Sequence, residues 1–308
     1  MSGEQMKAPN ELQESILELK RKLNAVIAAH NYQRPEVQDI ADFYGDSLEL
    51  ARECAKVDAE VIVLCGVQFM AESAAILNPE RTVLLSEGGA GCPMADMIDA
   101  DDLREWKQRY PQAAVVCYVN SSAAVKAESD VCCTSANALQ VVESLPNNEI
   151  LFIPDRHLGH YVSTKTDKRI ILYPGYCAPH QRLKPRHIEL ARELYPDAGA
   201  VVHPECSAEV IAQADAALST SQMIRYVKGD SRNAFLIGTE EGILHRMRQE
   251  NPEKSFHLLT TGLLCPDMKK TTLESIVRTM QERRNIVTVP EEVRVRAKLA
   301  LDRMIEVS

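Results

Sequence analysis

Three cysteines stand at nearly equal separations in this 308-residue chain. Cys92, Cys177 and Cys265 each come shortly after a predicted strand, and a proline follows each of them within two residues. The first two are 85 residues apart and the last two are 88 residues apart. This long repeat predicts three copies of one structural unit, each delivering one thiol to a common place. Three thiols at one point would hold a metal or a cluster, because thiolates bind soft metals and iron–sulfur centres.

The number of matched thiols indicates what kind of centre they would form. Structural zinc sites normally have four protein ligands and short Cys-x-x-Cys pairs, which this sequence lacks. A cluster held by three cysteines would have one iron without a thiol, and that iron could polarise a substrate oxygen as a Lewis acid. The alternative is three ordinary loop cysteines. Five further cysteines lie in or beside apolar runs and are interpreted as small buried hydrophobes, namely Cys54, Cys65, Cys117, Cys132 and Cys133.

Hydroxyl side chains stand at the start of three predicted helices. Ser47 lies 45 residues before Cys92, and Thr220, which follows Ser219, lies 45 residues before Cys265. Ser135 takes the corresponding place in the middle unit, 42 residues before its cysteine. A helix N-terminus presents unpaired N–H groups that favour anions. One such residue is most often only an N-cap, but three at matched positions predict an anion-binding cleft.

Groups capable of acid–base chemistry follow the first strand of each predicted unit. His30 and His203 each end a strand and lie 62 residues before the cysteine of their unit. A histidine or glutamate in such a place can be a plain surface residue. Together, however, these groups would surround one site with proton donors and acceptors, as general acid–base catalysis requires. The candidates are His30, Tyr32, Tyr118, Asn120, His180, His203 and Glu205.

Strands and helices alternate along almost the whole sequence, which predicts α/β units with parallel sheets. The expected units are residues 1–98, 99–183 and 184–270, and the helices within 271–308 are expected to pack back on the first unit. The loops at the carboxyl ends of parallel strands form the ligand-binding face of such units. Three units around a rough threefold axis would direct three such faces into one central cleft.

Composition narrows the class of protein further. The hydrophobic fraction of 45% and the charged fraction of 26% are ordinary for a soluble globular protein. A net charge of −9 argues against non-specific nucleic-acid binding. Residues 1–20 lack the apolar core of a signal peptide, and the longest apolar run, 61–70, is about half of a membrane span. We therefore expect a cytoplasmic protein without membrane or nucleic-acid partners, whose nine cysteines are not structural disulfides.

The motifs around these residues resemble those of the quinolinate synthase family of the de novo NAD pathway. The resemblance runs from about residue 29 to residue 274, nearly the whole chain. One departure is Asp267, since the third cysteine motif reads CPDMK where CPNMK is expected. The matching motifs are AHNYQ, GDSL, EGGAGCPMADM, YVNSS, TSAN, PDRHLG, PGYCAPH, HPEC and CPDMKKTTLE.

This resemblance implies three homologous three-layer αβα domains with parallel sheets around a pseudo-threefold axis, and an active site at their central interface. It also implies a 4Fe–4S cluster with one cysteine ligand from each domain, which matches Cys92, Cys177 and Cys265. The family condenses iminoaspartate with dihydroxyacetone phosphate and forms quinolinate with loss of phosphate and two waters. Pathway logic then implies an aspartate oxidase or dehydrogenase that supplies the iminoaspartate.

The resemblance also assigns roles to the candidate side chains. Tyr32 and Glu205 would assist proton transfers, with His203 and Tyr118 as further catalytic groups. The residues expected to bind substrate are His30, Ser47, Tyr118, Asn120, Ser135, His180, His203, Glu205, Ser219 and Thr220. Three other classes stay open: a different open-iron dehydratase acting on a small hydroxy acid, a redox sensor or electron carrier, and a metal-free binding protein for an anionic metabolite.

Overall fold

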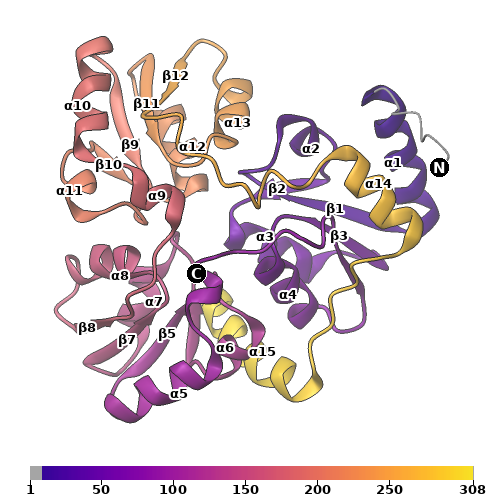
Figure 1. Cartoon of the computed structure of the whole chain (residues 1–308), viewed down its shortest axis with the longest axis horizontal. Coiled ribbons are helices and arrows are strands. Elements are labelled where there is room, and N and C mark those ends of the chain that lie inside the picture. Colours follow the sequence, from indigo (N-terminus) through magenta and orange to yellow (C-terminus); the bar gives the residue numbers. More distant parts are fainter. Residues whose placement is uncertain (1–8, 308) are drawn as a thin grey trace.

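The computed structural model describes residues 9–307, and residues 1–8 and 308 of the predicted units lie outside this range. Figure 1 shows three lobes, each built on one sheet. The first sheet has the strand order β2-β1-β3-β4 and is parallel throughout. Its elements are α1 (Pro9–Leu23), β1 (Ala25–His30), α2 (Pro35–Asp39), β2 (Phe43–Gly45), α3 (Ser47–Lys56), β3 (Val61–Cys65), α4 (Gln68–Leu77) and β4 (Thr82–Leu85).

The second and third sheets repeat the first, with the orders β6-β5-β7-β8 and β10-β9-β11-β12. The middle part holds a short 3₁₀ turn (Ala95–Met97), α5 (Ala100–Arg109), β5 (Ala114–Tyr118), α6 (Ala123–Ala127), β6 (Val131–Cys133), α7 (Ala138–Ser144), β7 (Glu149–Ile153), α8 (Arg156–Ser163), β8 (Arg169–Leu172) and α9 (Ala178–Arg182). The remainder holds α10 (Pro185–Leu194), β9 (Gly199–Val202), α11 (Ala208–Ile211), β10 (Ala216–Ala217), α12 (Thr220–Gly229), β11 (Ala234–Gly238), α13 (Ile243–Glu250), β12 (Ser255–Leu258), α14 (Leu273–Glu282) and α15 (Glu291–Glu306).

Each sheet is covered by helices on both faces, which is why its central strands read as continuous apolar runs. In β3, Ile62 and Leu64 pack toward α3 and α4, whereas Val61 and Val63 pack toward α1 and α14. The third sheet divides in the same way between α10 and α11 on one face and α12 and α13 on the other. The prediction of a three-layer α/β fold with parallel sheets is therefore confirmed.

The repeat extends to individual hydrogen bonds. In each unit an aspartate just before the second strand accepts a hydrogen bond of 2.7 Å from a backbone N–H of the first strand, 15 residues earlier. These carboxylates fasten the edge strand of each sheet to its first strand. The pairs are Asp42 with Ile27, Asp130 with Val115, and Asp215 with Ala200.

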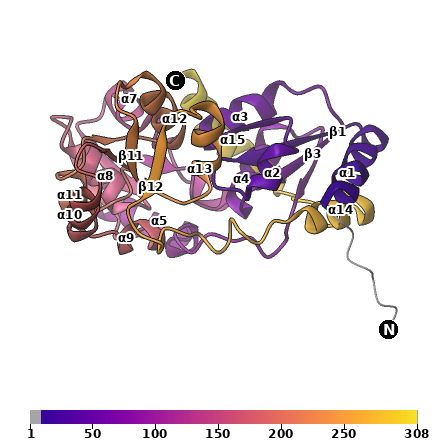
Figure 2. The same cartoon turned by 90° about the horizontal axis from the view of Figure 1, so that it is seen from above.

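The two C-terminal helices pack against different sheets. Helix α14 packs against α1, β3 and β4 of the first sheet, and Figure 2 shows it beside α1. Helix α15 instead packs mainly against α6 and β6 of the second sheet and also touches α4 of the first. Its buried face, Ala297, Ala300, Leu301 and Met304, belongs to an apolar cluster that both sheets share, which explains this position. No helix within residues 9–307 combines the length and the hydropathy that crossing a bilayer requires.

Candidate active site

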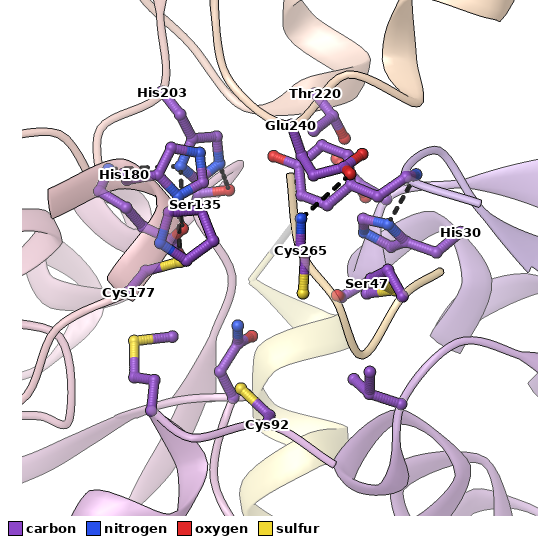
Figure 3. A pocket seen from close by; sticks show the side chains of 18 of the residues that line it. His30, Ser47, Cys92, Ser135, Cys177, His180, His203, Thr220, Glu240 and Cys265 are labelled. Atoms are coloured by element: carbon purple, nitrogen blue, oxygen red, sulfur yellow. Dashed lines mark hydrogen bonds and ion pairs between the residues drawn. The ribbon is translucent and has the colours of Figure 1, made fainter. Parts of the chain in front are cut away.

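A cavity lies where the carboxyl ends of strands from all three sheets meet. Figure 3 shows side chains from the three units facing this space. Thirteen of the fourteen side chains that the sequence interpretation singled out line it: His30, Tyr32, Ser47, Cys92, Tyr118, Asn120, Ser135, Cys177, His180, His203, Glu205, Thr220 and Cys265. The remaining residue, Ser219, lies behind the wall as the N-cap of α12, where its hydroxyl accepts a hydrogen bond from the Gln222 N–H. The fold thus brings together in one cavity residues that are up to 235 positions apart in the sequence.

The three matched cysteines differ from the other six. Cys92, Cys177 and Cys265 are free and partly exposed to the cavity, whereas the remaining free cysteines are buried. In Figure 3 their sulfur atoms face one shared space from three sides. Burial raises the pKa of the Cys92 thiol to about 12 and also raises the pKa of Cys265. A cation in the cavity would reverse this preference, because metal binding releases thiol protons and uses the thiolates as ligands.

The spread of the donor atoms bears on which metal centre fits. Within residues 9–307, the one trio of metal-binding side chains whose donor atoms all lie within 4.8 Å of one another is Cys177, His180 and Glu205. The three cysteine sulfurs do not form such a trio, whereas sulfurs around a single tetrahedral zinc would lie about 3.8 Å apart. The thiols are thus more widely spread than that trio, and as soft donors they suit a metal or an iron–sulfur centre.

Loops that carry two of these thiols are tied together. Asp267 Oδ1 accepts a hydrogen bond of 3.3 Å from the Gly91 N–H and one of 2.7 Å from Lys270 Nζ. Gly91 precedes Cys92, and Asp267 comes two residues after Cys265. The residue that departs from the expected family motif thus joins the Cys92 loop to the Cys265 loop.

Glu205 is the centre of a buried polar network opposite the thiols. Its Oε2 lies 2.7 Å from His180 Nδ1 and 3.4 Å from His203 Nδ1, and the two imidazole rings stack at 4.8 Å. Burial by itself would raise the pKa of Glu205, but His203 and His180, with a hydrogen bond from Tyr118, lower it well below its usual range. Glu205 is thus an ionised carboxylate at neutral pH and a proton acceptor at the cavity wall.

His30 and His203 occupy equivalent positions with the same local bond. The Nδ1 of each ring accepts a hydrogen bond from the backbone N–H two residues later, at 3.1 Å from Tyr32 and 3.3 Å from Glu205. Burial lowers the pKa of His30 to about 4 and that of His203 to about 3. Both rings are therefore neutral at pH 7 and carry their proton on Nε2. His203 Nε2 lies 3.1 Å from Ser135 Oγ, so this ring donates into the cavity wall.

Both tyrosines of the cavity are held in their protonated form. Burial, followed by the negative charge of Glu205, raises the pKa of Tyr32 and of Tyr118 well above the usual value. The Tyr118 hydroxyl bonds to Glu205, and the Tyr32 hydroxyl bonds to Thr239. Both phenols therefore keep their O–H as a hydrogen-bond donor at the cavity.

Two helices of ten residues begin at the cavity. Asp46 caps the Leu48 and Glu49 N–H groups of α3, and Ser219 caps the Gln222 N–H of α12. Ser47 is the first residue of α3, and Thr220 is the first residue of α12. The N-caps of these helices contact each other, because Ser219 Oγ donates to Asp46 Oδ2 at 3.4 Å. Asn120 also lines the wall, and its side-chain oxygen is buried without a hydrogen-bond partner. The arrangement suits a ligand with anionic groups and one hydrogen-bond donor.

Sequence reasoning missed several groups at this site. Glu240 lines the cavity and accepts hydrogen bonds from the Cys265 N–H at 3.2 Å and the Gly242 N–H at 2.7 Å. Its carboxylate also pairs with Lys269 Nζ at 3.0 Å, so it fixes the loop that carries the third thiol. The sequence signal for Glu240 is an acidic residue just after β11, the third strand of its unit. For acid–base groups, the internal repeat marks only the ends of the first strands, so it does not point to Glu240. Other lining residues that were not considered are Asp46, Phe69, Thr134 and Met268.

The fold and the cavity define a class: proteins of three similar α/β units whose strand ends converge on one thiol-lined site. The family model described as "Quinolinate synthetase A protein" matches residues 14–306, and the chain belongs to this family. It is 54% identical over 292 residues to a quinolinate synthase of Dehalococcoides mccartyi, covering 95% of this chain and 97% of that protein. It is 52% identical over 297 residues to the quinolinate synthase of Thermodesulfovibrio yellowstonii, covering 96% and 98%. The counterpart from Alkaliphilus metalliredigens is 50% identical over 295 residues, covering 96% and 97%.

Proposed function

We propose that this protein is a quinolinate synthase. It condenses iminoaspartate with dihydroxyacetone phosphate and forms quinolinate with loss of phosphate and two waters, as a cytoplasmic step of NAD biosynthesis. The observation that carries the proposal is the meeting of three thiols, three imidazoles and the carboxylate of Glu205 in a single cavity. The names of the relatives support the same reaction. An aspartate oxidase or dehydrogenase would supply the iminoaspartate.

The proposed cofactor is a 4Fe–4S cluster held by Cys92, Cys177 and Cys265. Three free thiols, one from each unit, whose sulfurs do not all lie within 4.8 Å of one another, support this choice. When bound, the cluster supplies Lewis acidity from the iron that has no protein thiol, which suits the removal of water from a hydroxyl-bearing substrate.

The proposed substrate-binding groups are those that present donors to anions. The N-termini of α3 and α12, with the hydroxyls of Ser47 and Thr220, suit the phosphate of one substrate or the carboxylates of the other. The neutral rings of His30 and His203 add N–H donors, and Ser135 and Asn120 add polar contacts from the second unit. Ser219 would act through Asp46 and the start of α12 and not by direct contact.

The proposed proton acceptor is Glu205, and the proposed donors are Tyr32 and Tyr118. The carboxylate is ionised while both phenols stay protonated, so protons can be removed from and returned to carbon or oxygen atoms within one cavity. His180 bonds to Glu205 and orients it. The division into units 1–98, 99–183 and 184–270 is part of this proposal, since each unit contributes one thiol and one set of strand-end groups.

An anaerobic assay with purified protein tests the proposal directly. We expect quinolinate to form when iminoaspartate and dihydroxyacetone phosphate are both present, and not with either substrate alone. The matched pair Glu205→Gln and Glu209→Gln separates site from surface, because Glu209 lies on α11 outside the cavity. Loss of quinolinate in the first variant and its retention in the second are expected. A cluster-loaded protein that forms no quinolinate from the two substrates would favour an electron carrier or another dehydratase.

A further inference from the structure

Thr239 lies directly behind the cavity and contacts two of its polar groups. Its side chain is fully buried, and it follows β11 in the third unit without lining the cavity itself. Its Oγ1 lies 2.5 Å from the Tyr32 hydroxyl and 2.8 Å from His180 Nε2. Tyr32 comes from the first unit and His180 from α9, so one hydroxyl joins three separate parts of the chain.

The contacts of His180 extend this network to Glu205 and to one of the thiols. His180 Nδ1 lies 2.7 Å from Glu205 Oε2 and 3.1 Å from Cys177 Sγ. The carboxylate is the closer and the stronger acceptor, so Nδ1 donates to Glu205. On the other side of the ring, His180 Nε2 lies 2.8 Å from Thr239 Oγ1, so the two ring nitrogens link Glu205 to Thr239.

A threonine hydroxyl has one proton and two lone pairs, so Thr239 can bond to Tyr32 and His180 at the same time. Thr239 Oγ1 thus links the Tyr32 hydroxyl to His180 Nε2. The result is one continuous chain of hydrogen bonds from Tyr32 through Thr239 and His180 to Glu205. All four side chains lie at or behind the same cavity wall, where a lost bond is not replaced by bulk water.

The backbone of Tyr32 is already secured without Thr239. Its N–H donates to His30 Nδ1 at 3.1 Å, and its carbonyl accepts from Lys269 Nζ at 2.7 Å. For the phenol hydroxyl, the bond to Thr239 is the one hydrogen bond that the described part of the chain records. The direction of this O–H, unlike the position of the backbone, therefore depends on a single side chain.

We propose that Thr239 is a positioning residue for the reaction. Its hydroxyl fixes the Tyr32 hydroxyl and the ring of His180, which contacts Glu205, so that proton donor and proton acceptor keep a defined relation across the boundary between units. This inference rests on the proposed function. The known consequence of slight misplacement in an active site is a loss of turnover more than of binding.

The variants Thr239→Val and Thr239→Ser test the inference in the cluster-loaded protein. Valine keeps the shape of threonine and removes the hydroxyl, whereas serine keeps the hydroxyl. We expect kcat for quinolinate formation to fall about 10- to 100-fold in the valine variant, with KM values changing less than about threefold. Serine is expected to restore most of kcat. A purely structural role would instead be rescued by valine as well as by serine, or better, since valine fills the same space.

Two controls keep the result interpretable. Thr271 is also fully buried, and its Oγ1 lies 2.8 Å from Ser86 Oγ outside the cavity, so Thr271→Val removes a comparable hydroxyl without touching the chain of bonds. We expect this variant to retain kcat. Iron content must also be measured, because Thr239 precedes Glu240, which holds the Cys265 loop. Wild-type kcat in a fully loaded Thr239→Val protein would overturn the positioning role, whereas absence of quinolinate from the wild-type protein would overturn the proposed function.

Discussion

The first and second sheets meet through an apolar junction, whereas the third sheet joins both of them through hydrogen bonds. One continuous apolar cluster runs from β3 and α4 into β5, β6 and β7 and takes in the buried face of α15. The strands of the third sheet pack into two clusters of their own. Beyond β12, Met268 belongs to the shared cluster and Cys265 packs against it, while Tyr32 of the first unit packs against one of the third-sheet clusters. In Figure 1, helix α15 lies along the apolar junction between the first and second sheets.

The polar junction uses side chains that also belong to the candidate active site. Its hydrogen bonds join Asn31 with Thr220, Tyr32 with Thr239, Gln38 with the Gly242 carbonyl, Glu49 with Ser221, Ser135 with His203, and Tyr161 with the Ala217 carbonyl. Hydrogen bonds can be exchanged for bonds to water at small net cost, while separated apolar faces cannot be compensated in this way. The difference teaches that the first two sheets share one apolar core, whereas hydrogen bonds between buried side chains hold the third sheet against them.

The largest expected effect comes from opening a hole in the apolar junction. Leu301 on α15 is fully buried in the shared cluster, whereas Leu299 on the same helix is 57% exposed. Leu301→Ala should lower the free energy of unfolding by about 2–5 kcal/mol, because the lost contacts leave a cavity between two sheets. Leu299→Ala should change it by less than about 0.5 kcal/mol. Denaturant unfolding measures both, and equal effects would contradict the shared core.

A smaller effect is expected from the polar junction. Gln38 is buried, and its Nε2 donates to the carbonyls of Asn31, Gln33 and Gly242 at 3.2, 2.9 and 2.9 Å. Gln38→Met keeps the length of the side chain and removes all three bonds, which should cost about 1–3 kcal/mol. Amide hydrogen exchange should rise in α13 and in the loop after β11, while β5 and β7 keep their protection. Uniform loss of protection in all three sheets would argue against a separable third unit.

The apolar junction also carries a pH-dependent ion pair at its edge. Glu128 contacts Arg104 at 2.8 Å and Arg296 of α15 at 2.9 Å. Burial raises the pKa of Glu128, but the hydrogen bonds and charges of Arg104 and Arg296 outweigh it and lower the pKa below its usual value. A folded-state pKa below the unfolded one means that the stabilisation is present above the unfolded pKa and is lost as pH falls through the folded pKa.

This network is expected to add little to the free energy of unfolding, because both arginine side chains are more than half exposed and water screens their charges. At pH 7, Glu128→Gln should lower the free energy of unfolding by about 0.5–1 kcal/mol. The difference between variant and wild type should shrink as pH falls below about 4. Denaturant unfolding across this pH range checks the sign, and a difference that grows at low pH would contradict it.

The smallest effect is expected from a surface pair at the polar junction. Arg225 Nη1 lies 3.2 Å from Glu49 Oε1, and their side chains are 65% and 39% exposed. Arg225→Gln should change the free energy of unfolding by less than about 0.5 kcal/mol, and even this should vanish at high salt. Melting temperatures at low and high salt provide the measurement. A larger, salt-resistant effect would mean that surface charges, and not the buried bonds, hold the third unit.

Site residues could be predicted from the sequence where the same residue type recurs at the matching position of successive units. Cys92, Cys177 and Cys265, like His30 and His203, stand at matching places in successive units, and the fold brings them to one cavity. The alternation of strands and helices is equally informative about the fold. A sheet covered by helices on both faces requires a continuous apolar run in each central strand.

Other features left no such signal. Thr239 and Glu240 act from the third strand of one unit only, so no internal repeat marked them. The two-sided packing of α15 was also out of reach, because the periodicity of a helix shows which of its faces is apolar but not which neighbours cover it. The edge strands β2 and β6 are three residues each, too short for an alternating pattern to stand out.

The most direct test of the central claim is the iron and acid-labile sulfide content of anaerobically purified protein. The wild-type protein should contain about four irons and four sulfides per chain. The Cys206→Ala variant should match it, because Cys206 is buried and does not line the cavity. The Cys177→Ser variant should lose the cluster, since one of its three protein ligands is gone. A full complement of iron and sulfide in Cys177→Ser would contradict the claim that three thiols from three units hold one cluster.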